Sequence, residues 1–202
     1  MFQNKRILLV SAHPDDLEFG LGGLLNKLDK DNILAVIFSD TKNLNDEPII
    51  EELNNSMRIY DISFKLRKDI INMNFVNQER EIKQILYDLK NEYKPDIIFS
   101  TSKRSHNPDH RILGESVQAV FQEQTVLFYE TVRADYEHRP NLYVKIDGVD
   151  LDVKIKAISQ YISQLSKRHY AKLELVKSQA VFRGSQIGES YAEAFEIGRM
   201  VV

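Results

Sequence analysis

Two short clusters of histidine and aspartate in this chain have the residue types and spacing to bind a metal ion. The first is His13-Pro14-Asp15-Asp16, and the second, at residues 106–110, is HNPDH. An imidazole and a carboxylate three residues apart on one tight turn can converge on a single cation, while the carboxylate between them faces the same cavity. A catalytic zinc ion keeps three protein ligands and an open position for water, so the second cluster would supply the remaining ligand. The alternative is that Asp15 and Asp16 only cap the N-terminus of a helix.

Both clusters directly follow a predicted buried strand. Residues 7–10 (ILLV) and residues 97–99 (IIF) are continuous apolar runs, which are typical of parallel strands covered on both faces. Pro14 cannot extend the first strand. Because ligands of open α/β sheets bind outside the carboxyl ends of the strands, we expect the two clusters to meet in one crevice there.

At these residues the sequence resembles the PIG-L/LmbE family of zinc-dependent N-acetyl deacetylases, whose signatures are AHPDDE and, about a hundred residues later, HxDH. The matching segments here are AHPDDLE and HNPDH. Further likeness lies in KPDIIF, LFYE and VFRGSQIGESYAEAFE, so the resemblance covers nearly the whole chain. It implies a Rossmann-like α/β fold, a three-layer sandwich with a mainly parallel sheet and the active site at the carboxyl ends of the strands.

The resemblance also implies roles for individual residues. His13, Asp16 and His110 would ligate Zn2+, and Asp15 would be the general base that takes a proton from the attacking water. Fe2+ would accept the same ligands. Asp109, beside His110, would orient an imidazole ligand by a hydrogen bond without binding the metal itself.

The second motif departs from the family pattern, which has a further histidine three residues before the ligand. Here Asn107 occupies that position and His106 lies one residue earlier. Asn107 could hydrogen-bond an oxyanion but could not carry a proton to the leaving amine, whereas His106 could do both. We therefore predict His106 as the auxiliary catalytic residue, with Asn107 as a substrate contact.

Other substrate contacts are predicted from position and resemblance. Family members carry an arginine before paired glutamates at the start of the second helix, but Ile49 and Ile50 precede Glu51 and Glu52 here. The remaining candidates are Arg80 at a helix start, and Tyr129, Glu130 and Arg133 at a strand end; Arg80 and Glu130 could instead be ordinary surface charges. The resemblance also places the turn at residues 183–193 at the active-site rim, with Tyr191 and Glu193 near it, and the alternative is that Tyr191 packs this terminal segment on the core. The polar loop at residues 39–48 is expected to form part of the pocket rim.

Composition bounds the class of protein. The chain has 202 residues, 43% of them hydrophobic and 28% charged, which is typical of one globular domain spanning 1–202. A net charge of -3 with scattered basic residues argues against a nucleic-acid partner. The absence of cysteine excludes thiolate ligands and disulfides. The N-terminal apolar run is too short for a signal peptide or membrane insertion, so a cytoplasmic location is expected.

The remaining segments alternate between strand and helix patterns. Strands are predicted at residues 33–38, 96–101, 126–130 and 142–146, with an ambiguous segment at 64–75. Helices are predicted at residues 17–30, 51–60, 78–93, 111–122, 151–165 and 170–182. Gly20, Gly22 and Gly23 in the first helix indicate a close approach to the sheet or to a ligand.

The function predicted from these features is removal of an N-acetyl group from an N-acetylglucosamine-type amino sugar conjugate or related small amine, releasing acetate. One alternative is a zinc amidase or esterase acting on a different acylated metabolite. Another is a metal-binding or ligand-binding protein of the same fold without turnover, although a base such as Asp15 is not needed for binding alone. The sequence leaves open whether the chain forms a homo-oligomer.

Overall fold

The computed structural model describes residues 1–40, 49–132, 134–167 and 172–202. Its centre is a seven-stranded sheet in the order β3-β2-β1-β4-β5-β7-β6. The strands are β1 (Ile7–Ser11), β2 (Ile33–Ile37), β3 (Phe64–Leu66), β4 (Ile97–Ser100), β5 (Thr125–Tyr129), β6 (Leu142–Ile146) and β7 (Tyr191–Arg199). The helices are α1 (Asp16–Lys27), α2 (Ile49–Tyr60), α3 (Glu79–Tyr93), α4 (Pro108–Val120), α5 (Gly148–Ile158), α6 (Ile162–Lys167) and α7 (Leu173–Ser185).

The five strands from β3 to β5 run parallel, while β7 and β6 are antiparallel to their neighbours. The predicted mainly parallel α/β fold is therefore confirmed. Strand β1 pairs with β2 on one side and with β4 on the other, and all five of its residues are buried. This burial on both faces explains why its sequence is continuously apolar rather than alternating.

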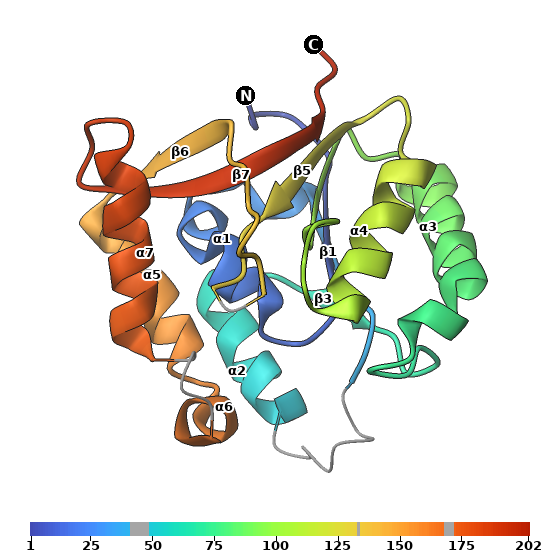
Figure 1. Cartoon of the computed structure of the whole chain (residues 1–202), viewed down its shortest axis with the longest axis horizontal. Coiled ribbons are helices and arrows are strands. Elements are labelled where there is room, and N and C mark those ends of the chain that lie inside the picture. Colours follow the sequence, from blue (N-terminus) through green and yellow to red (C-terminus); the bar gives the residue numbers. More distant parts are fainter. Residues whose placement is uncertain (41–48, 133, 168–171) are drawn as a thin grey trace.

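Helices cover both faces of the sheet (Figure 1). On one face, apolar side chains of α1, α2 and α5 pack with Ile7 and Leu9 of β1. On the other, α3 and α4 pack with Leu8 and Val10. Successive residues of β1 thus enter opposite cores, which is the period of a strand. The result is a three-layer sandwich in which the carboxyl ends of β1 and β4 lie between the two helical layers.

The glycines of α1 allow this helix to lie close to the sheet. A Cβ atom at Gly20 would overlap the ring of Tyr129 in β5, and one at Gly23 would lie 2.7 Å from Ile146 in β6. The predicted close approach is therefore made to the sheet.

Two boundaries differ from the sequence prediction. The single helix expected at residues 151–165 is divided into α5 and α6, because the turn after Ile158 closes with a hydrogen bond from Tyr161 N–H to Ile158 O. Apolar periodicity continues across such a turn and hides it. The helix expected at residues 170–182 continues to Ser185, and β7 begins at Tyr191 after a short turn. Tyr170, the predicted start of α7, lies outside the described residues.

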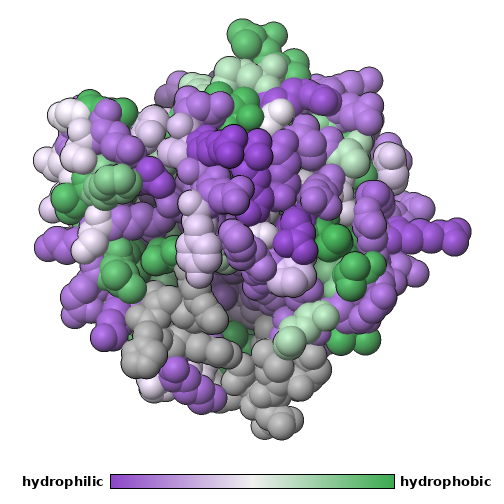
Figure 2. All heavy atoms as spheres, viewed as in Figure 1, coloured by the Kyte–Doolittle hydropathy of each residue, from purple (hydrophilic) through white to green (hydrophobic). Residues whose placement is uncertain are grey.

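The face seen in Figure 2 is mainly hydrophilic, with hydrophobic residues in small separate groups among the described residues. Across the described part of the chain, no helix has both the length and the apolar character needed to cross a lipid bilayer.

Candidate metal centre at the carboxyl ends of β1 and β4

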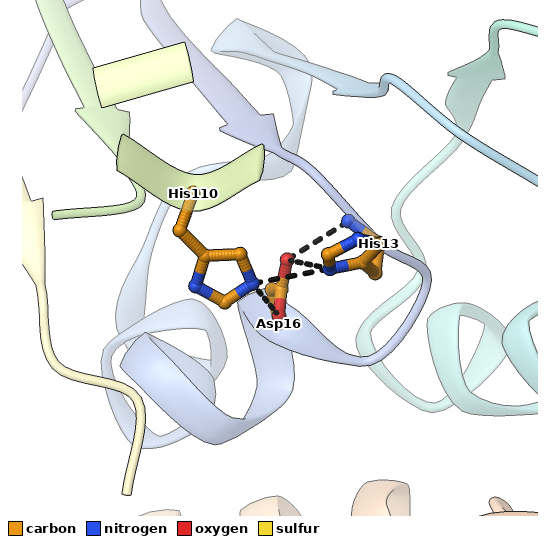
Figure 3. A group of neighbouring side chains, drawn as sticks. All are labelled: His13, Asp16 and His110. Carbon is orange, nitrogen blue, oxygen red and sulfur yellow. Dashed lines mark hydrogen bonds and ion pairs between the residues drawn. The ribbon is translucent and has the colours of Figure 1, made fainter. Parts of the chain in front are cut away.

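The two predicted clusters are brought together by the pairing of β1 with β4. Leu9 of β1 is in register with Phe99 of β4, so both strands end at the same edge of the sheet. The chain turns after β1 into α1, whose first residue is Asp16, and His110 lies in the first turn of α4. Residues almost a hundred positions apart in sequence therefore face one another (Figure 3).

His13, Asp16 and His110 form a compact group in which one ligand atom from each lies within 4.8 Å of the others. Nδ1 of His13 is 3.1 Å from Nε2 of His110. The two carboxylate oxygens of Asp16 lie 3.2 Å from Nε2 of His110 and 3.5 Å from Nδ1 of His13. Figure 3 shows these atoms directed toward one point.

The other side of the His13 ring indicates which of its nitrogens is free to bind a metal. Nε2 lies 3.0 Å from Oδ1 of Asn72 and 3.3 Å from Oδ2 of Asp109, and both oxygens are acceptors. We therefore assign the proton to Nε2, which leaves the lone pair of Nδ1 facing His110. Two imidazole nitrogens and a carboxylate oxygen that converge in this way are a donor set suited to zinc. His110 lacks such an orienting contact, because its Nδ1 is buried without a partner among the described residues.

The charges around this group favour a cation. Burial alone would lower the pKa of His13, but hydrogen bonds to the carboxylates of Asp109 and Asp16 outweigh it and raise the pKa to about 10. Burial tends to raise the pKa of Asp16. Its contacts with His110 and His13 lower that pKa by more, so the pKa lies well below the usual range. A metal ion can take the place of the proton that His13 would otherwise hold.

Asp15 differs from Asp16 in both contacts and pKa. It occupies the cap position of α1, yet its side chain makes no capping hydrogen bond, so the structural alternative of a simple helix cap does not apply to it. Burial, and then the negative charge of Asp16, raises the pKa of Asp15 to about 6. Neighbouring carboxylates whose pKa values are driven apart are characteristic of sites in which one binds charge and the other transfers protons.

Asn72 and Met73 form part of the site and were not found from the sequence. The Met73 N–H donates to Oδ2 of Asp109 over 2.6 Å, and the Phe75 N–H donates to Oδ1 over 3.3 Å. Met73 has a φ of 63°, a left-handed conformation that is uncommon for a residue with a side chain and that recurs at functional sites. The segment lies in a region whose pattern was ambiguous, and no local signal marks it. By contrast, the predicted orienting role of Asp109 matches its contact with His13.

The residues before His110 are arranged differently from the expectation. Asn107 caps α4, and its side-chain oxygen accepts a hydrogen bond from the Asp109 N–H at 2.9 Å. His106 is exposed, and its ring lies 4.9 Å from that of Tyr136. The backbone N–H of His106 donates to the carbonyl of Ala134 over 2.7 Å. No hydrogen bond joins its ring to the metal-binding group among the described residues.

Three predicted substrate contacts have mainly structural surroundings. Tyr129 is fully buried and donates its hydroxyl to the carbonyl of Val10, so the prediction that it contacts substrate is not supported. Glu130 accepts two hydrogen bonds from the guanidinium of Arg183, at 2.6 and 2.8 Å. Arg80 is exposed in the first turn of α3, on a surface that it shares with neighbouring side chains of the same helix.

The C-terminal candidates are also structural. Glu193 is buried, accepts hydrogen bonds from the N–H groups of Gly23 and Leu24, and pairs with Lys154. Tyr191 packs in an apolar cluster with α5 and α7. These contacts favour the structural alternative for both residues.

Two further expectations concern segments at the rim. Arg133 and residues 41–48 of the polar loop lie outside the described residues. The glutamate pair of α2 is described: Glu52 accepts hydrogen bonds from the N–H and hydroxyl of Ser163 at the start of α6. Glu52 therefore joins α2 to α6.

Comparison with known proteins adds to this geometry. The PIG-L family model, described as GlcNAc-PI de-N-acetylase, matches residues 8–121. Diacetylchitobiose deacetylase of Thermococcus kodakarensis is 25% identical over 220 residues, covering 94% of this chain and 81% of that protein.

Solved structures share the fold. The N,N'-diacetylchitobiose deacetylase of Pyrococcus horikoshii, in complex with its inhibitor MPG, has a TM-score of 0.79 and 23% identity over 97% of this chain and 85% of that one. GalB, the 4-carboxy-2-hydroxymuconate hydratase of Pseudomonas putida KT2440, has a TM-score of 0.78 and 19% identity over 98% of each chain.

Proposed function

The chain belongs to the PIG-L family, and on this basis we propose that it is a metal-dependent hydrolase that removes an N-acetyl group from an N-acetylglucosamine-type amino sugar and releases acetate. The observation that carries this proposal is the convergence of His13, Asp16 and His110 beside a second carboxylate that does not act as a helix cap. A metal-binding role alone would not require that second carboxylate, Asp15.

The residues present are suited to zinc as the resident metal. Nδ1 of His13, Nε2 of His110 and a carboxylate oxygen of Asp16 would hold it. Iron(II) would accept the same ligands. When bound, the metal would polarise the acetyl carbonyl and make water a nucleophile at neutral pH.

Asp15 would act as the general base. It lies in the turn between two of the proposed ligands, and the raised pKa of its half-buried carboxyl, about 6, is close to the value at which a carboxylate transfers protons efficiently near neutral pH. In the proposed reaction Asp15 takes a proton from the attacking water as the water oxygen bonds to the acetyl carbon. The C–N bond then breaks, the amine gains a proton, and acetate leaves.

The leaving amine needs a proton donor. We propose His106, because it is a titratable side chain at the N-terminal side of α4, four residues before His110. Asn107 would contribute its amide N–H to the substrate, since its side-chain oxygen is already used in capping. Arg80, which is exposed, remains a proposed substrate contact through its charge, and Glu130 would contact the substrate only together with its partner Arg183.

The names of the two related diacetylchitobiose deacetylases support an acetylated amino sugar as the substrate. The likeness to GalB supports a different outcome, because a hydratase shares this fold. Three functions are therefore to be distinguished for the site: a deacetylase, an amidase or esterase for another acyl group, and a protein that binds without turnover.

The test combines metal content with acetate release from diacetylchitobiose and from N-acetylglucosamine conjugates. We expect about one metal ion per chain in wild type, loss of metal in His110→Ala, and retained metal with a rate lowered about 10²- to 10⁴-fold in Asp15→Asn. Asp69→Asn is the matched control, because Asp69 is an exposed carboxylate paired with Arg67.

The alternatives give different results in the same experiment. Metal binding without acetate release from any acetylated sugar would reject the deacetylase, and a panel of other acyl donors would then separate an amidase from a binding protein. Full metal content in His110→Ala would reject the proposed ligands.

A further inference from the structure

We propose that Tyr161, at the junction between α5 and α6, is a positioning residue that fixes the turn carrying His13, Asp15 and Asp16. This proposal rests on the proposed function, because it concerns the same metal centre. No sequence motif or residue spacing links Tyr161 to that turn, which lies almost 150 positions earlier.

Three polar backbone groups of the turn, at His13 and Pro14, have an identified partner. The hydroxyl of Ser11 donates to the carbonyl of His13 over 2.7 Å, and the His13 N–H donates to Oδ2 of Asp16 over 2.8 Å. The carbonyl of Pro14, which is buried, accepts from the hydroxyl of Tyr161 over 2.7 Å. The first two contacts are within the turn, whereas the third attaches the turn to the junction between α5 and α6.

Tyr161 is itself held firmly in place. Its side chain is fully buried in the core under α1 and α2, and its N–H closes the last turn of α5 on Ile158 O. The hydroxyl also lies 2.7 Å from Oε1 of Glu18, a buried carboxyl of α1, so its single proton is shared between this oxygen and the carbonyl of Pro14. The hydroxyl of Ser56, in α2, donates to Oε1 of Glu18 over 2.5 Å.

The junction is tied to α2 a second time. Glu52 accepts hydrogen bonds from both the N–H and the hydroxyl of Ser163, at 2.8 and 2.6 Å. Ser163 lies two residues after Tyr161. The junction that carries Tyr161 is therefore fixed by contacts with Glu18 of α1 and Glu52 of α2, in addition to its contact with the turn.

This arrangement has a consequence for the metal centre. Pro14 immediately precedes Asp15 and Asp16, so displacement of its carbonyl would displace one proposed ligand and the proposed base together. Displacements of about 1 Å in catalytic groups can lower rates by about 10²-fold. The effect on substrate binding should be small, because Tyr161 is fully buried and cannot contact substrate.

Tyr161→Phe tests the proposal, because it removes the hydroxyl and keeps the ring. The matched control is Tyr93→Phe, which removes a hydroxyl that donates to the carbonyl of Asn32 over 2.6 Å, between α3 and the start of β2. The measurements are kcat and KM for deacetylation, zinc affinity by competition with a chelator, and the melting temperature.

For Tyr161→Phe we expect kcat to fall about 10- to 100-fold with KM within about twofold of wild type. Zinc affinity should fall about tenfold. Tyr93→Phe should lower the melting temperature by a similar amount and leave kcat and zinc affinity unchanged. Tyr161→Phe with kcat and zinc affinity both within about twofold of wild type would overturn the proposal, even if its melting temperature falls. If wild type releases no acetate, the proposed function fails, and zinc affinity alone decides the role of Tyr161.

Discussion

Oδ2 of Asp109 lies 3.3 Å from Nε2 of His13, while Asp16 and His110 approach the same imidazole at Nδ1. The His13 ring therefore has the orienting carboxylate of Asp109 on one side. On its other side lie Asp16 and His110, which would bind the same metal ion. Carboxylate partners of this kind fix the tautomer and increase the basicity of a ligating histidine.

Replacing Asp109 with asparagine should weaken metal binding without removing a ligand. Asp109→Asn loses the negative charge that holds the proton on Nε2 of His13, and we expect zinc affinity to fall about 10- to 100-fold in a chelator competition assay. Asp69→Asn makes the same chemical change in an exposed pair and should leave zinc affinity unchanged. Equal affinity in wild type and Asp109→Asn would show that the contact does not orient the ligand.

His106 and Asn107 can be separated by measuring rate and stability together. His106→Ala should lower kcat about 10²-fold or more if His106 protonates the leaving amine, with little change in the free energy of unfolding because its side chain is exposed. Asn107→Ala should lower the free energy of unfolding by about 1 kcal/mol, because the cap of α4 is lost.

The control for this pair is Asn107→Asp, which retains an oxygen acceptor for the cap. It should unfold at about the same urea concentration as wild type. A His106→Ala protein with an unchanged kcat would remove His106 from the mechanism.

The buried ion pair of Lys154 and Glu193 should be important for stability. The two charges lie 2.7 Å apart with only 3% of each side chain exposed, and the carboxylate also binds two N–H groups of α1. Lys154→Met leaves this carboxylate without a counter-charge, and we expect a loss of about 3–5 kcal/mol in urea unfolding. Adding Glu193→Gln to Lys154→Met should recover part of that loss. If the single variant is as stable as wild type, the pair contributes nothing net.

Asp150 should make stability depend on pH. Burial tends to raise its pKa, but hydrogen bonds from the Asp147 N–H and from the Asn26 and Lys27 side chains outweigh burial and lower it. A carboxyl with a lowered pKa in the folded state contributes stability above its unfolded pKa, about 3.9, and that contribution is lost as the pH falls through the folded pKa.

Asp150→Asn should therefore be less stable than wild type at pH 7, by about 1 kcal/mol. The difference should shrink below about pH 4, because the unfolded wild-type chain begins to bind a proton there whereas the folded carboxyl does so only at its lower pKa. Urea unfolding of both proteins at several pH values measures it. If the difference in stability between the two proteins stays constant down to pH 3, the effect comes from the shape of the side chain at position 150 and not from its charge.

The parallel part of the fold could be predicted from the sequence because its signals are local. A continuous apolar run such as residues 7–10 indicates a strand buried on both faces, and the two histidine and aspartate clusters directly follow such runs. The expected fold is confirmed, and the structure brings His13, Asp16 and His110 together. The family resemblance seen in the same motifs is confirmed by the family match.

Predictions were less accurate where the outcome depends on neighbours distant in sequence. Tyr129 ends β5 and Glu193 lies near the start of β7. Both carry polar groups, and the strand end in one case and the family resemblance in the other made them candidates for the pocket or its rim. Tyr129 is instead buried against α1, and Glu193 binds the backbone of α1. Nothing in their local sequence distinguishes a polar group facing a pocket from one facing a buried backbone.

The sequence by itself determined the residue types of the metal centre and the strands that carry them, because both are encoded in segments of fewer than twenty residues. Only the tertiary structure decided which groups hold these residues in place. Asn72 at His13 and Tyr161 at Pro14 are brought there by the packing of separate elements, which also decided that the imidazole contacted by Asp109 is that of His13. Such contacts join residues far apart in the chain, so their geometry follows from how the layers pack and leaves no periodic or spacing signal in the sequence.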